Sequence, residues 1–152
     1  MSSLRGVRIA FGTDERTPLT DGLVRTLSGQ GHDVVVLAAG SEWPEVGAAV
    51  GDAVGSGGAD FGVVCCTTGT GVSIAANKVA GVRAALCTDA ATATGARRWN
   101  DANVLAFGLR LTTELLAAEM LDAFLATPFD DAERAAVDRL EAGPRPGPAA
   151  LR

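Results

Sequence analysis

Short apolar runs rich in β-branched residues alternate with helical patterns along the chain, and this alternation constrains the fold most. The extended runs cover residues 7–12, 34–37, 61–66, 82–86 and 104–107. The main helical patterns cover residues 19–30, 44–55, 89–98 and 113–125. Strands that alternate with helices form parallel sheets, with right-handed crossovers and helices on both faces. The sequence therefore predicts an α/β fold with a parallel five-stranded sheet between two layers of helices.

The chain has 152 residues, which is enough for one domain with a sizeable core. After Pro128 the pattern predicts a final polar helix over 130–141. A Pro/Gly-rich stretch, GPRPGPAALR, follows and can sustain neither helix nor strand. We therefore expect a single domain over 1–142 and a mobile tail over 143–152.

The composition disfavours several classes of partner and site. A net charge of -5, without a basic stripe, argues against nucleic acid. Neither a leader with a cleavage site nor a bilayer-spanning apolar stretch is apparent, so we expect a cytoplasmic protein with no membrane contact. Three cysteines without a secreted disulfide pattern indicate reduced thiols. The single histidine, His32, excludes multi-histidine metal sites.

Two polar loops follow predicted strands, at the sheet edge where such folds bind ligands. The loop GTDERT places Asp14 and Glu15 after the first strand, where a helix cap with solvated charges is the alternative interpretation. The loop over 67–71 follows Cys66, and its backbone N–H groups could hold a phosphate or an oxyanion. A tight strand-to-helix turn is the alternative there. Nucleotide binding is the weakest hypothesis, because both the Walker A motif and the dinucleotide fingerprint are missing.

Two longer motifs carry a family resemblance. CCTTGTGVSIAANKVAGVRAAL and WNDANVLAFGLR, with EWP at 42–44, resemble the metal-free sugar-phosphate isomerases of the ribose-5-phosphate isomerase type B and galactose-6-phosphate isomerase family. The resemblance covers about residues 7–140. It implies a Rossmann-like αβα domain that interconverts an aldose and a ketose through an enediolate, without metal or other cofactor. It also implies a sugar or sugar phosphate as substrate, and a homodimer with shared active sites or a tetramer.

The resemblance assigns roles to individual residues. Cys66 matches the family's cysteine base, with a buried structural cysteine as the alternative. Asn100 matches the asparagine that reaches the neighbouring subunit's site and supports the enediolate. Thr68 completes the predicted catalytic set. The predicted substrate-binding residues are Asp14, Glu15, Thr67, Gly69, Thr70, Gly71, Ser73, Trp99, Arg110 and Arg134. Within that set, residues 67–71 form the anion cradle, and Ser73 caps the following helix or touches substrate.

Three departures from the family pattern concern the substrate. Trp99 replaces the histidine that opens a cyclic sugar, and indole can neither accept nor supply that proton. Glu15 replaces a histidine near the phosphate, and Asp138 replaces one of two arginines in the C-terminal helix, while Arg110 and Arg134 remain. We therefore expect a substrate other than ribose 5-phosphate, open-chain or unphosphorylated. The alternative is a catalytically inactive sugar-binding or interaction protein on the same fold.

Other polar or reactive residues have structural interpretations. We expect Cys65 and Cys87 in the core. His32 is expected in a surface or capping role. Arg97 and Arg98 are expected at a solvated helix end, with a substrate contact near Trp99 as the alternative. Asn77 and Lys78 are expected at the end of the helix that follows the glycine loop.

Overall fold

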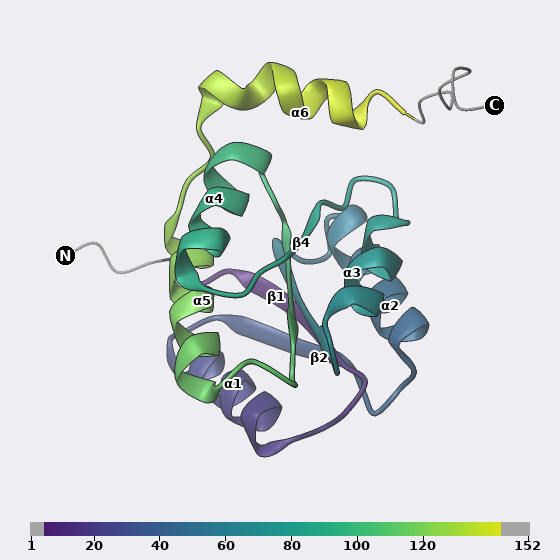
Figure 1. The fold of residues 1–152 in the computed structure, drawn as a ribbon, viewed down its shortest axis with the longest axis vertical. Coiled ribbons are helices and arrows are strands. Elements are labelled where there is room, and N and C mark those ends of the chain that lie inside the picture. Colours follow the sequence, from purple (N-terminus) through teal and green to yellow (C-terminus); the bar gives the residue numbers. More distant parts are fainter. Residues whose placement is uncertain (1–4, 144–152) are drawn as a thin grey trace.

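The structure of the protein is a computed structural model that describes residues 5–143. Parallel strands form one sheet in the order β2-β1-β3-β5-β4 (Figure 1). The strands are β1 (Arg8–Thr13), β2 (Asp33–Ala39), β3 (Phe61–Cys66), β4 (Ala84–Leu86) and β5 (Val104–Gly108). The predicted α/β fold with a parallel five-stranded sheet is confirmed. Apart from Gly143, the predicted tail lies outside the described residues.

Local sequence explains where several helices begin. Thr17 caps the first helix by accepting the N–H of Thr20, and the Thr20 hydroxyl accepts the N–H of Thr17 in return. Asp89 and Thr113 cap two later helices through their side-chain oxygens. The helices are α1 (Pro18–Gly29), α2 (Trp43–Gly55), α3 (Thr70–Asn77), α4 (Ala90–Asn100), α5 (Glu114–Ala126), the 3₁₀-helix η1 (Asp131–Glu133) and α6 (Arg134–Glu141). Over residues 5–143, no helix has the length and apolar character that crossing a bilayer requires.

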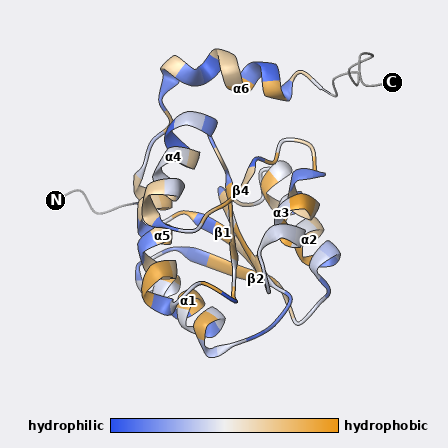
Figure 2. Ribbon diagram, in the orientation of Figure 1, coloured by the Kyte–Doolittle hydropathy of each residue, from blue (hydrophilic) through white to orange (hydrophobic). Residues whose placement is uncertain are grey.

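Two layers of helices enclose the sheet. Helices α1, α4 and α5 cover one face, and α2 and α3 cover the other (Figure 1). Because side chains alternate along a strand, β3 contributes Val63 and Cys65 to the first core and Val64 and Cys66 to the second. Figure 2 shows hydrophobic residues along the strands between the two layers. The sheet edge that carries the loops is thereby held between two packed cores.

The observed bounds of the five strands and of α1, α2, α4 and α5 lie within two residues of the predicted ones. Strand β4 begins at Ala84 instead of residue 82. The N–H of Val82 closes a turn onto Val79, and the N–H of Arg83 donates to the Asn103 side chain. Since both N–H donors are used outside the sheet, the paired residues of β4 begin at Ala84. The predicted helix over 130–141 is divided into η1 and α6.

Two buried polar side chains correct the sequence interpretation. Arg97 was expected in solvent but is only 8% exposed, and its guanidinium lies over the rings of Phe61 and Phe124, 5.0 and 5.7 Å from their centroids. His32 is also buried, which rules out the surface role, but its Nδ1 accepts the N–H of Val7 at 3.2 Å, in agreement with the capping alternative. Contacts to residues distant in sequence explain why the exposure of both side chains was misjudged.

Helix α6 lies apart from the two helical layers, beyond the end of α4 (Figure 1). Ion pairs connect it to the body of the molecule: Arg83 with Glu141 at 2.8 Å, and Arg134 with Asp101 at 3.6 Å. Val137 is buried, but Leu140 is 59% exposed. Charged contacts therefore contribute much of the attachment of α6.

Candidate active site

Two of the predicted loops meet at the carboxyl edge of the sheet, where β1 lies beside β3. The chain adds β2 on one side of β1 and then β3 on the other, so the strand order reverses here. The N–H of Asp14 donates to the carbonyl of Cys65 at 3.2 Å, which brings the first loop against the end of β3. Open α/β sheets bind ligands in the crevice at such a point.

The adjacent cysteines at the end of β3 face opposite sides of the sheet. Cys65 is fully buried in the core beneath α1, α4 and α5, and this burial raises the pKa of its thiol to about 12. Its place in the core is as predicted, and so is that of Cys87. Cys66 faces the α2 and α3 layer, and its Sγ accepts the N–H of Gly69 at 3.2 Å. Of the two neighbouring thiols, only Cys66 thus contacts the glycine loop.

Helix α3 begins inside the segment that the sequence predicts as a loop. Thr70 and Gly71 form its first turn, so the loop proper is shorter than predicted. The first N–H groups of a helix have no intrahelical partner. The backbone N–H groups of Thr70 and Gly71 are therefore still available to an anion, as the sequence predicts for this segment. The hydroxyls of Thr68 and Thr70 lie 2.8 Å apart beside it.

Ser73 does not cap α3. The capping position belongs to Gly69, and the Ser73 N–H already donates to the Gly69 carbonyl within the helix. The expected capping role is therefore wrong. Asn77, at the other end of α3, exchanges two hydrogen bonds with the backbone of Ala84, in agreement with its expected structural role.

Close backbone contacts fix the shape of the loop. Gly69 has φ 80°, and a Cβ atom there would lie 2.6 Å from the carbonyl carbon of Phe107. A Cβ on Gly108 would lie 2.6 Å from the carbonyl oxygen of Thr68. Only glycine fits either position without a backbone shift. Gly69 and Gly108 therefore allow the loop after β3 and the loop after β5 to pack closely against each other.

Asp14 presents a buried oxygen with no partner among the described residues. Its Oδ1 accepts no hydrogen bond there. Burial, with a smaller contribution from the Glu15 charge, raises the pKa of the Asp14 carboxyl above its ordinary value. Glu15 is exposed, and its backbone carbonyl accepts the Thr13 hydroxyl at 2.7 Å. A hydroxyl donor from a ligand would satisfy the Asp14 oxygen.

Arg110 lies at the same sheet edge as Cys66. Its N–H donates to the carbonyl of Thr67 at 2.9 Å, and the side chain is exposed. A cavity of about 310 Å³ opens beside it, lined also by Thr67, Thr68, Thr88 and Thr112. Over residues 5–143, no carboxylate forms an ion pair with Arg110. This arginine is therefore available to an anion.

Trp99 and Asn100 lie at the opposite end of the sheet. Helix α4 runs from the carboxyl end of β4 back to the amino end of β5, and they are its last two residues. Cys66 pairs with Gly108 at the far end of β5, roughly 13 Å away along the strand at about 3.3 Å per residue. The structure does not bring Asn100 and Cys66 of one chain together. Trp99 is 56% exposed and its ring lies over Gly95, beside a groove that runs along α4.

Arg134 also lies far from Arg110, near the end of α4. Its guanidinium stacks on Phe129, 4.4 Å from the ring centroid, and pairs with Asp131 at 3.4 Å as well as with Asp101. Asp138 is exposed on α6. The two arginines that the resemblance assigns to phosphate binding therefore form no clamp within one chain.

Trp43 is a candidate site residue that the sequence interpretation did not include. It opens α2, and a Cβ on Gly71 would lie 2.8 Å from its ring. Trp43 is 45% exposed, and its ring packs beside the first turn of α3. The EWP motif at 42–44 marked this segment as part of the family resemblance, but no sequence signal connected it to Gly71.

Comparisons with known proteins identify the family. The sequence profile of the ribose/galactose isomerase family matches residues 9–141. Ribose-5-phosphate isomerase B of Escherichia coli (strain K12) is 38% identical over 128 residues, which cover 81% of this chain and 86% of that protein. The galactose-6-phosphate isomerase subunit LacB of Clostridium acetobutylicum is 37% identical over 126 residues, 80% of this chain and 73% of the relative.

A solved structure shows the same fold. The ribose 5-phosphate isomerase of Thermotoga maritima superposes with a TM-score of 0.83 at 33% identity, covering 90% of this chain and 99% of that one. The family match and the shared fold confirm the resemblance that the glycine-loop and WNDAN motifs indicate. The chain therefore belongs to the ribose/galactose isomerase family and is an aldose–ketose isomerase.

Proposed function

We propose that Cys66 is the base of this isomerase and that residues 67–71 hold the oxyanion of the enediolate. The observation that carries the proposal is the 3.2 Å hydrogen bond from the Gly69 N–H to the Cys66 Sγ, directly before the N-terminus of α3. An N–H donor and a helix N-terminus both favour negative charge, first on the sulfur and then on a nearby substrate oxygen. This chemistry needs no metal.

In the proposed reaction, the Cys66 thiolate removes the proton from C2 of the open-chain aldose. The C–H electron pair forms the C1–C2 double bond, and the carbonyl electron pair moves to O1 as negative charge. Donors from the first turn of α3 and the Thr68 hydroxyl stabilise that oxyanion. O1 gains the proton that O2 loses, and the thiol returns its proton to C1, which gives the ketose. The unpartnered Oδ1 of Asp14 accepts a sugar hydroxyl.

The active site is shared between two copies of the chain in this proposal. Asn100 and Arg134 lie at the end of the sheet opposite Cys66, so they can reach a Cys66 site only in another subunit. Large apolar side chains are exposed near the β4 edge: Leu86 at 38%, Trp99 at 56% and Leu111 at 80%. An association that covers them would remove apolar surface from water. We therefore propose a homodimer in which Asn100 of one subunit supports the enediolate at the other.

The proposed substrate is an open-chain or unphosphorylated sugar. Trp99 supplies no acid or base for ring opening, and its exposed ring can stack on a sugar face. The charges near the proposed phosphate position also disfavour a dianion. Arg134 is already paired with two aspartates, and Glu15 and Asp138 add negative charge. Arg110 remains the available cation at the sheet edge.

Isotope exchange tests this function. The protein is incubated in deuterated water with a panel of aldoses, ketoses and their phosphates, and deuterium at C1 or C2 is measured by NMR. We expect exchange with at least one open-chain substrate, and a rate about 10²-fold or more lower with the Cys66→Ala variant. Sugar binding that Cys66→Ala leaves unchanged, without exchange by the wild type, would instead indicate a binding protein on this fold.

A further inference from the structure

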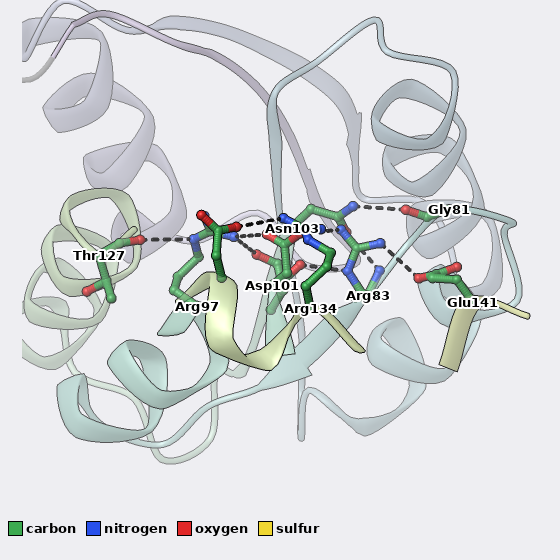
Figure 3. A network of polar contacts seen from close by, with 10 residues as sticks. Gly81, Arg83, Arg97, Asp101, Asn103, Thr127, Arg134 and Glu141 are labelled. Carbon is green, nitrogen blue, oxygen red and sulfur yellow. Dashed lines mark hydrogen bonds and ion pairs between the residues drawn. The ribbon is translucent and has the colours of Figure 1, made fainter. Parts of the chain in front are cut away.

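The carboxylate of Asp101 is held by three arginines at the end of α4 (Figure 3). Arg97 donates from Nη1 to Oδ1 at 3.1 Å, while Arg83 and Arg134 reach Oδ2 at 3.5 and 3.6 Å. The Asp101 side chain is only 22% exposed. Arg97 lies one helical turn before Asp101 on α4, whereas Arg83, before β4, and Arg134, on α6, come from segments that are distant in sequence. A contact of this kind fixes one geometry far better than a single surface ion pair does.

The backbone of Asp101 is fixed as well. With φ 48° and ψ 41° it lies in the left-handed region, and over residues 5–143 it is the one residue other than glycine with positive φ. Arg83 Nε donates to the Asp101 carbonyl and Arg97 Nη1 to the Ala102 carbonyl, each at 2.7 Å. The arginines thus hold both the side chain and the turn at which α4 stops. A strained conformation that its surroundings maintain in this way is typical of a functional site.

The helix end defined by Asp101 carries the two exposed residues of the WND motif. Asn100 is the last residue of α4 and precedes Asp101 directly, and Trp99 precedes Asn100. The position of Asn100 therefore depends on where the helix stops and how the chain turns there. Arg97, which holds the Asp101 carboxylate, is buried in the core, whereas Asn100 is exposed.

We propose that Asp101 is a positioning residue that acts in trans: it holds Asn100 of its own subunit in the orientation that the partner subunit's Cys66 site requires. The inference rests on the proposed function, in which Asn100 serves that site. The same carboxylate holds Arg134, so one group orients two residues that reach the partner. Asp101 itself makes no contact with substrate.

A fluorescence measurement tests the positioning without any need for turnover. The chain has two tryptophans, so a Trp43→Phe background leaves Trp99 as the only reporter beside Asn100. Asp101→Asn tolerates the left-handed backbone but removes the charge. We expect a faster anisotropy decay of Trp99 in Asp101→Asn, and no change in Glu141→Gln, which removes a different ion pair of Arg83. An unchanged decay in Asp101→Asn overturns the proposal.

Mixed dimers test the action in trans. Asp101→Asn and Cys66→Ala, expressed alone, should each lose exchange activity by about tenfold or more, because catalytic geometry tolerates little displacement. In a purified heterodimer of the two variants, one site combines an intact Cys66 with an Asn100 held by an intact Asp101. We expect about half of the wild-type activity there, because one of the two symmetry-related sites is complete. No recovery, or full activity of Asp101→Asn alone, overturns the proposal.

Two further controls separate the possible failures. If Asp101→Asn does not fold, the same two measurements are made on Arg83→Lys. Lysine keeps the positive charge but lacks the Nε donor to the Asp101 carbonyl, so the end of α4 should again be less well held. If the wild type exchanges deuterium with no sugar, the proposed function fails, while the anisotropy of Trp99 still decides whether Asp101 holds the end of α4.

Discussion

Gly108 lies directly against the backbone of Thr68, so the end of β5 sets the position of the loop that follows Cys66. Two backbone hydrogen bonds run alongside this contact, from Leu109 to Cys66 and from Arg110 to Thr67, each at 2.9 Å. The thiol and the exposed arginine are therefore placed by one short ladder. Movement of the loop after β3 or of the loop after β5 would therefore displace both the Cys66 thiol and Arg110.

Adding a methyl group at this contact should separate the loops. In Gly108→Ala the new Cβ would meet the Thr68 carbonyl oxygen at 2.6 Å, and backbone must move to relieve the clash. We expect a loss of about 1–3 kcal/mol in the free energy of unfolding, measured in urea, and a larger proportional loss of isomerase turnover. Gly29→Ala, at a position where a Cβ would meet nothing within 4 Å, is the control. Equal stability of both variants would contradict the close contact.

The two cysteines of β3 should respond oppositely to substitution. Cys66→Ala should lower the rate of C2 exchange by about 10²-fold or more, because it removes the proposed base, while the fold is retained. Cys65→Ala should retain the exchange rate but lose about 1 kcal/mol of unfolding free energy, because it leaves a small void in the core. Exchange rates and urea midpoints of both variants check this. Equal exchange rates in the two variants would remove Cys66 from the mechanism.

The stability of the protein should depend on pH through Asp14. Burial raises the pKa of the folded-state carboxyl above its ordinary value, so the unfolded chain releases this proton first as pH rises. Stability from this group is therefore fully present below the unfolded pKa and is lost as pH rises through the folded pKa. Asp14→Asn removes the cost of a buried charge and should be more stable than the wild type near neutral pH.

The sign of this effect can be measured by urea unfolding at several pH values. The advantage of Asp14→Asn should shrink as pH falls toward the unfolded pKa, because the wild-type carboxyl becomes protonated. Asp52→Asn, at an exposed position on α2, provides the control. An advantage that grows toward low pH would contradict the assigned shift. Activity of Asp14→Asn should fall despite its added stability, as is common for binding residues.

Introducing the histidine that the family resemblance implies at position 99 should extend the substrate range. Trp99→His returns an acid/base group to the WND motif, and acid/base catalysis typically contributes about 10²-fold or more. We expect the rate with cyclic ribose 5-phosphate to rise, while the rate with open-chain sugars rises little. Trp99→Phe removes the indole without adding a titratable group and should not gain this activity. Coupled assays on both substrate types distinguish the variants, and no gain with Trp99→His would exclude ring opening as the limiting step.

The sequence predicted what depends on neighbouring residues and missed what depends on distant ones. The alternation in FGVVCC predicted a buried strand and a core position for Cys65. The burial of Arg97 was not predictable, because the residues that surround it, Phe61 and Phe124, belong to other elements. Contacts that form only when distant elements pack leave no local pattern.

The same distinction holds at the candidate site. A thiol beside a glycine loop is a local feature, and the Cys66 contact with Gly69 agrees with it. The packing of Trp43 on Gly71 and the pairing of Arg134 with Asp101 both join separate segments, and the sequence indicated neither. The capping alternative for Ser73 was wrong because α3 begins at Thr70, after a left-handed Gly69, and the sequence does not show where that helix starts. The substrate contact of Ser73 stays a prediction.

The length of β5 between Asn100 and Cys66 has a consequence for how substitutions combine. The two residues share no contact in one subunit, so their effects on the unfolding free energy of that subunit should add. In the proposed site shared by two subunits, their effects on transition-state stabilisation combine and should depend on each other. A substitution at Trp99, the proposed ring-opening position, should therefore leave the packing around the Cys66 thiol of its own subunit unchanged.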